Sequence, residues 1–445
     1  MIGKIEENPQ LNLFQVPLVQ FINKDHELVQ LSKKIDWVKL EDDLKVYYCT
    51  ENGRPGIPIR LITGIIMLRR IYNLSDESVL NRWVENPYWQ YFTGEVNFSH
   101  KLPFDRTELI KFRLRIGEEG AERILKLSIE LFSDKEVKEK AVLVDTTVQE
   151  KNITYPTDVK LQKRIIEKCR KIAGKERIKL RQSYKMEMKQ LMIEQRFHNH
   201  PKRKKKALAA ARRIKIIAGR VVRDLERKMD TKQRVKYSNE MNVFVKVLTQ
   251  TKDTKGKIYS IHQPHVLCIA KGKEAKKYEF GNKSSIVKTV KSGIIVGAMA
   301  FHENLFDGDT LEPQLSQVER LTGSIPQIGI VDRGYRGRKI VNGTQIVLPH
   351  KLPEAATRYM RQKIRKWFRA RAGIEPIIGH VKHDHRMGRN YLRDPIGDSI
   401  NTILAAAGFN LRKMLRRLKA GAKYIYELIL NWILTRQGNH EYQLI

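Results

Sequence analysis

The chain has 445 residues, and its 85 lysines and arginines against 49 aspartates and glutamates give it a net charge of +36 with histidine neutral. Such an imbalance is self-repulsive in a compact protein unless a polyanion offsets it, which excludes a neutral metabolic enzyme as the default and indicates nucleic acid or an anionic membrane. The hydrophobic content of 41% excludes a disordered basic tail, and the length suggests two or three domains.

The widely spaced cysteines Cys49, Cys169 and Cys268 support neither a disulfide framework nor a zinc site. No segment has the pattern of a secretory leader, and none reaches the roughly 18 apolar residues of a membrane span. We therefore expect a protein that is neither secreted nor membrane-spanning, located in the cytoplasm with the nucleoid, and bound to DNA and not to a membrane.

Residues 36–130 have the periodicity of a compact helical region. Ser75 with two acidic neighbours predicts a helix start, and the aromatic residues of segment 83–92 predict a small helical core, with base stacking or a dimer surface as alternatives. A helix over residues 107–116 would display Lys111, Arg113 and Arg115. It could enter a major groove, although basic surface helices are also common.

Segment 141–147 begins as a short apolar run that ends in Asp145, which is typical of a buried central strand. A helical stretch rich in lysine and arginine follows over residues 161–236. Its densest part is the basic run Lys202, Arg203, Lys204, Lys205 and Lys206. A solvated helical hairpin is one interpretation, but the scarcity of acids favours a DNA-gripping insertion.

Strand-like segments return at residues 257–262, 277–286 and 294–301, followed by a turn at 306–308 and a helix over 310–321. Segment 328–331 is a second apolar run, and it ends in Asp332. A further strand is expected at 345–348, and helices fill the chain to residue 434. This order predicts an α/β domain with a mixed sheet.

Asp145 and Asp332 each lie at the expected carboxyl end of an apolar strand, where ligands of open α/β sheets bind. A single aspartate there could simply cap a turn, but the duplicated context favours convergence of the two carboxylates. Hard oxygen ligands in a basic protein suggest Mg²⁺ or Mn²⁺.

Glu375 is the candidate for a third acid, in a stretch otherwise rich in lysine and arginine. At about 100° per residue, Phe368, Arg371, Glu375 and Lys382 fall within roughly 60° of one helix face. The two cations would hold phosphate oxygens while Glu375 completes the metal site. Gly373 and Pro376 predict a kink or a helix start close to Glu375.

Three motifs carry a resemblance to a known family. Val-Leu-Val-Asp145-Thr-Thr, Ile-Val-Asp332-Arg-Gly-Tyr and Phe368-x2-Arg371-x3-Glu375-x6-Lys382 resemble the DDE transposases of bacterial insertion sequences (insertion sequence 4/5 superfamily), in the branch with a Tyr-x2-Arg-x3-Glu-x6-Lys signature. The segment from Asn-Gly-Arg-Pro at residues 52–55 to residue 88 also resembles the amino-terminal helical domain of that superfamily. The departure is Phe368, which lacks the hydroxyl of the signature tyrosine.

The resemblance implies an RNase H-like catalytic domain with a mixed sheet and a helical insertion, plus an all-helical N-terminal domain. It implies that Asp145, Asp332 and Glu375 are catalytic and hold two Mg²⁺ or Mn²⁺ ions, and that the enzyme cuts double-stranded DNA at terminal inverted repeats and joins 3′ hydroxyls to target DNA. We expect a homodimer in a synaptic complex. The expected division is a DNA-binding or assembly domain at 1–130, the catalytic domain at 131–420 with its insertion at about 160–236, and a helical tail at 421–445.

Two alternatives remain open. One is an RNase H-like nuclease or resolvase, and the other is a catalytically inactive DNA-binding derivative, which Phe368 favours. The histidines need no catalytic role in any of these interpretations. His383 and His385 fit phosphate contact or a solvated surface better than metal binding.

Overall fold

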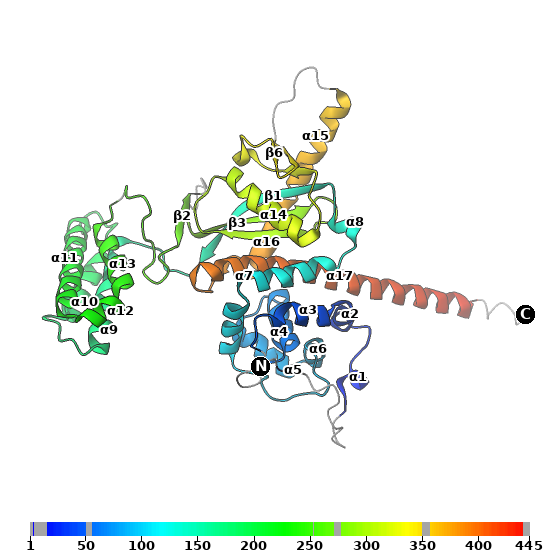
Figure 1. Cartoon of the computed structure of the whole chain (residues 1–445), viewed down its shortest axis with the longest axis horizontal. Coiled ribbons are helices and arrows are strands. Elements are labelled where there is room, and N and C mark those ends of the chain that lie inside the picture. Colours follow the sequence, from blue (N-terminus) through cyan, green and yellow to red (C-terminus); the bar gives the residue numbers. More distant parts are fainter. Residues whose placement is uncertain are drawn as a thin grey trace, which may run out of the picture. The chain divides into compact units, whose positions relative to one another are not determined.

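The computed structural model describes residues 3, 16–49, 56–251, 253–270, 277–348 and 357–438, and for residues 363 and 422–438 it describes only the backbone. Residues 52–55, part of the amino-terminal motif, lie outside it. The chain divides into two compact units: unit 1 is residues 1–150 with 283–445, and unit 2 is residues 151–282. Helices form most of both units, and strands form a mixed sheet (Figure 1).

The amino-terminal part of unit 1 is helical, as its periodicity predicts. Ser75 caps its helix by accepting a hydrogen bond from the Ser78 backbone. The basic helix predicted at 107–116 is longer than expected and kinks at Gly117, whose φ of 61° is in the left-handed region. The elements are α1 (Leu18–Phe21), α2 (Glu27–Lys34), α3 (Trp37–Lys45), α4 (Ile59–Ile71), α5 (Asp76–Glu85), α6 (Pro87–Phe92), α7 (Arg106–Glu130) and α8 (Asp134–Val137).

The sheet has the strand order β2-β3-β1-β5-β7-β6, with β4 paired to β3 and β8 paired to β1. Strand β1 is parallel to β5 and β5 to β7, whereas β3 and β4 are antiparallel, so the sheet is mixed as predicted. The strands are β1 (Ala141–Lys151), β2 (Leu267–Ala270), β3 (Tyr278–Thr289), β4 (Ile295–Phe301), β5 (Ile328–Ile330), β6 (Ile340–Val341), β7 (Thr344–Val347) and β8 (Arg389–Asn390).

Two strand predictions are wrong. Residues 257–262 form no regular strand, although their sequence alternates. Strand β1 does not end at Asp145 but continues to Lys151, because the β-branched residues Thr146, Thr147 and Val148 extend it beyond the apolar run. Asp145 therefore lies within a strand and not at its end.

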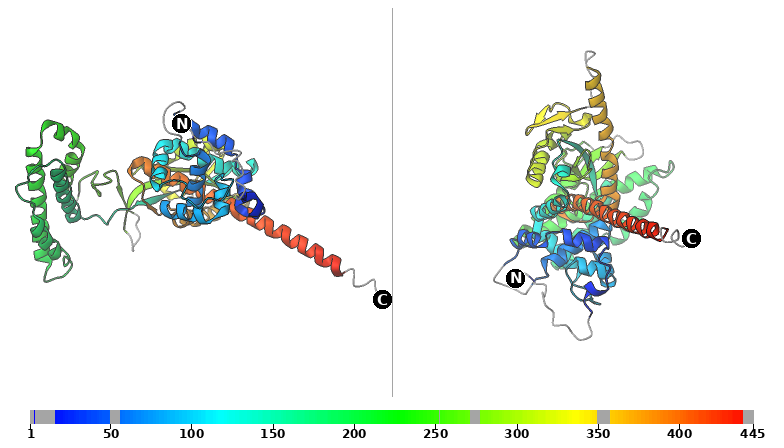
Figure 2. Two further views of the ribbon diagram at one scale, coloured as in Figure 1. Left: turned by 90° about the horizontal axis from the view of Figure 1, so that it is seen from below. Right: turned by 90° about the vertical axis from the view of Figure 1, so that its right-hand side faces the viewer.

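Helix α17 (Asp394–Gly438) packs against α7 and α4 of the helical layer and against β4 of the sheet, so it joins the two layers of unit 1 (Figures 1 and 2). It runs through residue 421 without a break. The remaining elements are η1 (Asp307–Thr310), α14 (Leu311–Thr322), η2 (Arg333–Tyr335), α15 (Arg358–Arg371) and α16 (Ile374–Asp384). Within the described ranges, no helix is both long and apolar enough to cross a bilayer.

Unit 2 is a helical bundle with a hydrophobic core of its own, which includes Ile165, Ile214, Leu225 and Phe244. It contains 37 lysines and arginines against 12 aspartates and glutamates, and this net charge of +25 is most of the +36 of the chain. Its helices are α9 (Asp158–Lys175), α10 (Lys185–Gln195), α11 (Lys204–Lys228), α12 (Thr231–Lys236) and α13 (Ser238–Thr249).

Candidate active site

The parallel pairing of β1 and β5 brings the segments that carry Asp145 and Asp332 next to each other. Leu143 of β1 pairs with Ile330 of β5, and each aspartate follows two residues later on its own chain segment. Because paired strands lie about 4.8 Å apart, the two aspartates lie on neighbouring segments of the chain, and both act electrostatically on the hydroxyl of Tyr335. The predicted neighbourhood of the two strands is therefore present in the fold.

Asp332 is held at the start of the short helix η2. Its Oδ1 accepts a hydrogen bond from the Gly334 backbone nitrogen at 2.8 Å. Its Oδ2 lies 3.6 Å from Nη2 of Arg371, a residue at the end of α15. The Asp332 carboxylate is thus oriented from two sides, by a backbone amide and by a guanidinium.

Arg371 links Glu375 to Asp332. The Arg371 Nη1 is 4.0 Å from Glu375 Oε1, and the Glu375 side chain is 67% exposed. The two residues do not share one helix, because α15 ends at Arg371 and α16 begins at Ile374, in agreement with the helix start predicted near Glu375. Arg371 therefore lies between two of the three candidate acids.

The predicted three-acid cluster is not formed. Across the described ranges, no group of three or more histidine, cysteine, aspartate or glutamate side chains is close enough to hold a metal ion. The residues nevertheless fit Mg²⁺, which usually takes one or two carboxylates and keeps several waters. The Arg371 guanidinium supports this fit, because it already places a positive charge between Asp332 and Glu375.

Phe368 and Lys382, the other signature residues, are both half-buried. Phe368 is in the last turn of α15 and Lys382 is near the end of α16. Because the two helices are separate, the four signature residues do not share one helix face as predicted. Phe368 and Arg371 are on α15, and Glu375 and Lys382 are on α16.

The predicted basic face of α7 is only partly exposed. Lys111 is exposed and pairs with Glu108 at 2.6 Å, and the guanidinium of Arg115 lies over the ring of Tyr48. Arg113 is 3% exposed and both of its terminal nitrogens contact Asp76. The expectation that Arg113 contacts DNA is therefore wrong, because its guanidinium is buried in an ion pair.

The basic run of unit 2 is at the surface. Lys202, Arg203, Lys204, Lys205 and Lys206 are all exposed, in the turn before α11 and in its first residues. The Arg203 guanidinium lies over the ring of Phe197. This placement is compatible with phosphate contact and leaves the predicted role untested.

A second basic surface is a cleft of about 1000 Å³ in unit 1, beside one face of α15. The helix contributes Tyr359, Gln362, Lys366 and Ala370, which are spaced at helical intervals. Across the cleft, further lysines precede β1 and follow β3: Lys135, Lys138, Lys140 and Lys291. Glu136 and Glu139 also line the cleft, so its five lysines against these two glutamates leave it a net charge of +3, which suits the backbone of a nucleic acid.

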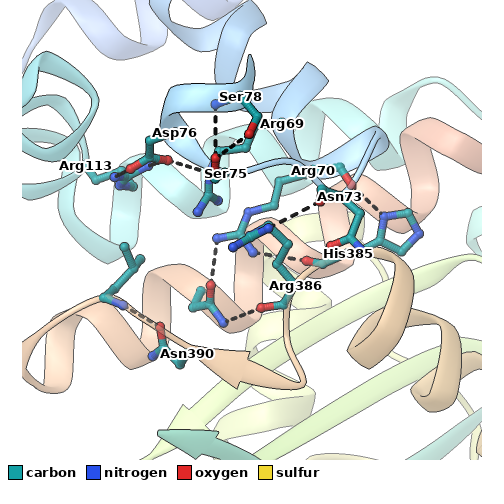
Figure 3. A network of polar contacts seen from close by, with 12 residues as sticks. Arg69, Arg70, Asn73, Ser75, Asp76, Ser78, Arg113, His385, Arg386 and Asn390 are labelled. Carbon is teal, nitrogen blue, oxygen red and sulfur yellow. Dashed lines mark hydrogen bonds and ion pairs between the residues drawn. The ribbon is translucent and has the colours of Figure 1, made fainter. Parts of the chain in front are cut away.

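A buried network ties the end of α16 to the amino-terminal helices (Figure 3). Arg70 donates to the carbonyl oxygen of His385 at 3.1 Å and to Asn401 Oδ1 at 2.8 Å, and Asn73 donates to the carbonyl oxygen of His383. Arg69 and Arg113 share the carboxylate of Asp76. The position of the helix that carries Glu375 therefore depends on α4.

His385 belongs to this network and not to the surface. It is 1% exposed, and burial lowers its pKa to about 4, so the neutral ring donates from Nδ1 to the carbonyl oxygen of Arg70 at 2.9 Å. The expectation of phosphate contact or a solvated surface is wrong for His385. His383 is exposed.

Two residues beside the site were missed from the sequence, Asp307 and Tyr335. Asp307 accepts a hydrogen bond from Thr146, the neighbour of Asp145, at 2.8 Å. Burial, with further contributions from Asp145 and Asp307, raises the pKa of Tyr335 above its usual range. Asp307 was interpreted as part of a turn. For Tyr335, the sequence offers only its place in the Asp-Arg-Gly-Tyr motif that begins at Asp332.

Comparison with known proteins gives two matches. A family model described as Transposase domain (DUF772) matches residues 16–115, and no solved structure matches the chain. A protein of Rhizobium meliloti described as uncharacterized protein ORF8 in the nfe locus is 37% identical over 193 residues, which cover 42% of this chain and 93% of that protein. Arg70 and Asp76, from the buried network, lie within the matched domain.

Proposed function

Because the chain belongs to the family of the Rhizobium meliloti ORF8 protein and carries a transposase domain, we propose that it is a DNA transposase of the DDE type, which cleaves at terminal inverted repeats and joins 3′ hydroxyl ends to target DNA. The observation that carries this proposal is the parallel pairing of β1 and β5, which brings the segments of Asp145 and Asp332 together. A mixed sheet with two acids on its central strands is also what an RNase H-like catalytic domain requires.

Asp145, Asp332 and Glu375 would hold Mg²⁺ or Mn²⁺, expected as two ions, which supply the positive charge that activates the attacking oxygen and stabilises the leaving oxygen of an in-line displacement. Arg371 has a separate task. Its guanidinium now bridges Asp332 and Glu375, and it would turn to a phosphate oxygen of the bound strand when metal takes over these carboxylates. Phe368 offers a ring for stacking against a base or sugar.

Double-stranded DNA is the partner that the charge distribution supports. Unit 2 supplies a net charge of +25, the cleft beside α15 supplies lysines, and Lys111 and Arg115 supply further exposed cations. Contacts of this kind bind the phosphate backbone without reading sequence. Two DNA ends must be processed together, so a homodimer in a synaptic complex is part of the proposal.

The test is cleavage of a labelled duplex that contains the inverted repeat flanking the gene, with Mg²⁺ or Mn²⁺ and with EDTA. We expect metal-dependent nicking at the 3′ end of the repeat. Asp145→Asn, Asp332→Asn and Glu375→Gln should each lower the nicking rate by at least about a thousandfold, since a catalytic metal contributes several kcal/mol to the barrier.

Affinity for the duplex, measured in the same buffer, should stay within about twofold of wild type in all three variants. Nicking that survives Asp145→Asn or Asp332→Asn would contradict the proposed site. A preference for four-way junctions over the repeat would favour a resolvase, and tight repeat binding without nicking would favour an inactive derivative.

A further inference from the structure

A fourth carboxylate, that of Asp307, faces the candidate site. Asp307 begins the short helix η1 after β4, and its side chain is 27% exposed. Its Oδ1 accepts hydrogen bonds from Thr146 Oγ1 at 2.8 Å and from Lys283 Nζ at 2.9 Å. These two donors come from β1 and β3, so the sheet itself fixes the orientation of this carboxylate.

The second oxygen of Asp307 lies near Asp332, on the other side of Gly334. A methyl group on Gly334 would lie 2.7 Å from Asp307 Oδ2 and 2.9 Å from Asp332 Oδ1. Both oxygens therefore flank the same small space above Gly334. Two carboxylate oxygens that share a space repel each other unless a cation or a proton lies between them.

The hydroxyl of Tyr335 is an independent sign that something polar binds here. Tyr335 is fully buried, and its hydroxyl makes no hydrogen bond of normal geometry with the described residues, although the Thr146 side chain lies close enough to act on its pKa. Asp145, Asp307 and Asp332 all act electrostatically on it, after the larger effect of burial. Buried hydroxyls nearly always have a partner, so an unpaired one among three acids indicates a missing ligand or water.

We propose that Asp307 is a fourth acid of the active site and binds, through Oδ2, a divalent cation that it shares with Asp332. This inference rests on the proposed function. The two acids form a pair and not a preformed cage of three, which suits an ion that keeps most of its waters. Lys283 and Thr146 would act as the outer contacts that orient a metal-binding carboxylate.

Asp309 provides a matched control two residues away. It is on the same short helix and is also ion-paired, but with Arg338 at the surface, where both side chains are about half exposed. Asp309→Asn removes the same charge as Asp307→Asn from the same element. It removes no oxygen that faces Asp332.

The first experiment measures Mn²⁺ binding to the full chain by calorimetry, without DNA. We expect Asp307→Asn to weaken binding at least about tenfold, as loss of a ligand or of its close support does, and Asp309→Asn to leave it unchanged. If Asp307→Asn binds like wild type while Asp145→Asn and Asp332→Asn do not, the inference is overturned and the proposed function stands. If none of the three variants weakens Mn²⁺ binding, the inference and the proposed function are both contradicted.

A second variant tests directly whether residue 307 binds a metal ion, because it should produce a new signal and not a loss of Mn²⁺ affinity. In Asp307→Cys a thiolate replaces the carboxylate, and soft thiolates bind soft metal ions. Added Cd²⁺ should give an ultraviolet thiolate-to-metal absorbance that Asp309→Cys lacks. Equal spectra for the two variants would show that residue 307 is not a ligand, whatever its effect on folding.

Discussion

The two units of this protein differ in how they use charge. Unit 2 has a net charge of +25 in 132 residues, and its basic run is exposed. Unit 1 has 48 lysines and arginines against 37 acids in 313 residues, and residues 1–150 alone have a net charge of −3. Many of the charges of unit 1 are paired at defined positions, as in the contacts of Asp76 with Arg69 and Arg113.

The difference suggests a division of work. Diffuse surface charge gives affinity for a polyanion that is independent of sequence and depends strongly on salt. Chemistry instead requires a few groups held within fractions of an ångström. Under the proposed function, unit 2 would contribute affinity for DNA and unit 1 the reaction, so mutations in the two units should affect different measurements.

The largest effect on stability should come from Asp76. Asp76→Asn leaves the buried guanidiniums of Arg69 and Arg113 without their carboxylate, which should cost about 3–5 kcal/mol of unfolding free energy. All five tryptophans are in unit 1, at positions 37, 83, 89, 367 and 432, so tryptophan fluorescence in urea follows this unit alone. Helical circular dichroism reports both units, so the part of its transition that tryptophan fluorescence does not show belongs to unit 2, and that part should be unchanged. A parallel loss there would show that the units do not unfold separately.

Acid should destabilise unit 1 in the same way. Burial alone would raise the pKa of Asp76, but Arg69 and Arg113 outweigh it and lower the pKa to about 2. A depressed carboxyl pKa stabilises the fold fully above the unfolded value of about 4, and this contribution, about 2 kcal/mol, is lost as the pH falls towards 2. Asp76→Asn should remove that part of the pH dependence.

A smaller effect, on rate and not on stability, is expected at Arg371. Arg371→Gln removes the guanidinium next to Asp332 and Glu375, and loss of phosphate positioning should slow nicking about a hundredfold. Arg369→Gln is the matched control, because it removes an exposed guanidinium from the same turn of α15. If both variants slow the reaction equally, the effect is one of net charge, and the proposed role of Arg371 is wrong.

The smallest effect should be the change in DNA affinity when the basic run of unit 2 is neutralised. Replacing Lys202, Arg203, Lys204, Lys205 and Lys206 with glutamine should weaken binding to any duplex about tenfold or more and lower the salt slope by about 0.9 for each phosphate that the protein no longer neutralises. Nicking at saturating DNA should be unchanged. The charge-matched control replaces five exposed lysines of unit 1: Lys24, Lys33, Lys34, Lys45 and Lys101. If both variants weaken DNA binding equally, the proposal that unit 2 supplies most of the DNA affinity is wrong.

The sequence is sufficient to predict the central strands, because uninterrupted apolar runs before Asp145 and Asp332 have few alternatives to a buried strand. The helix break near Glu375 also follows from local residues, Gly373 and Pro376. Periodicity cannot show which cation is buried, so Arg113 was assigned to the wrong environment. Its burial depends on Asp76, a partner 37 residues away.

Asp307 could not be identified in this way. It follows no apolar strand directly, and its neighbours in sequence are typical of a turn. Its place beside Asp332 arises from the return of the chain through β4 and η1 and from Lys283, which is distant in sequence. The approach of the Asp307 and Asp332 oxygens to Gly334 depends on tertiary structure and not on local sequence.

The boundaries of unit 2 fall at residues 150 and 282, inside β1 and β3, which are neighbours in the sheet. Neighbouring strands of a sheet are commonly joined by connections of only a few residues. In the chain, unit 2 therefore stands in the connection between two neighbouring strands, and connections of this kind are where chains tolerate inserted domains. In evolutionary terms, unit 2 is a module that could be gained or exchanged without changing the sheet. The DNA affinity and the catalytic activity proposed for the two units could therefore have evolved separately.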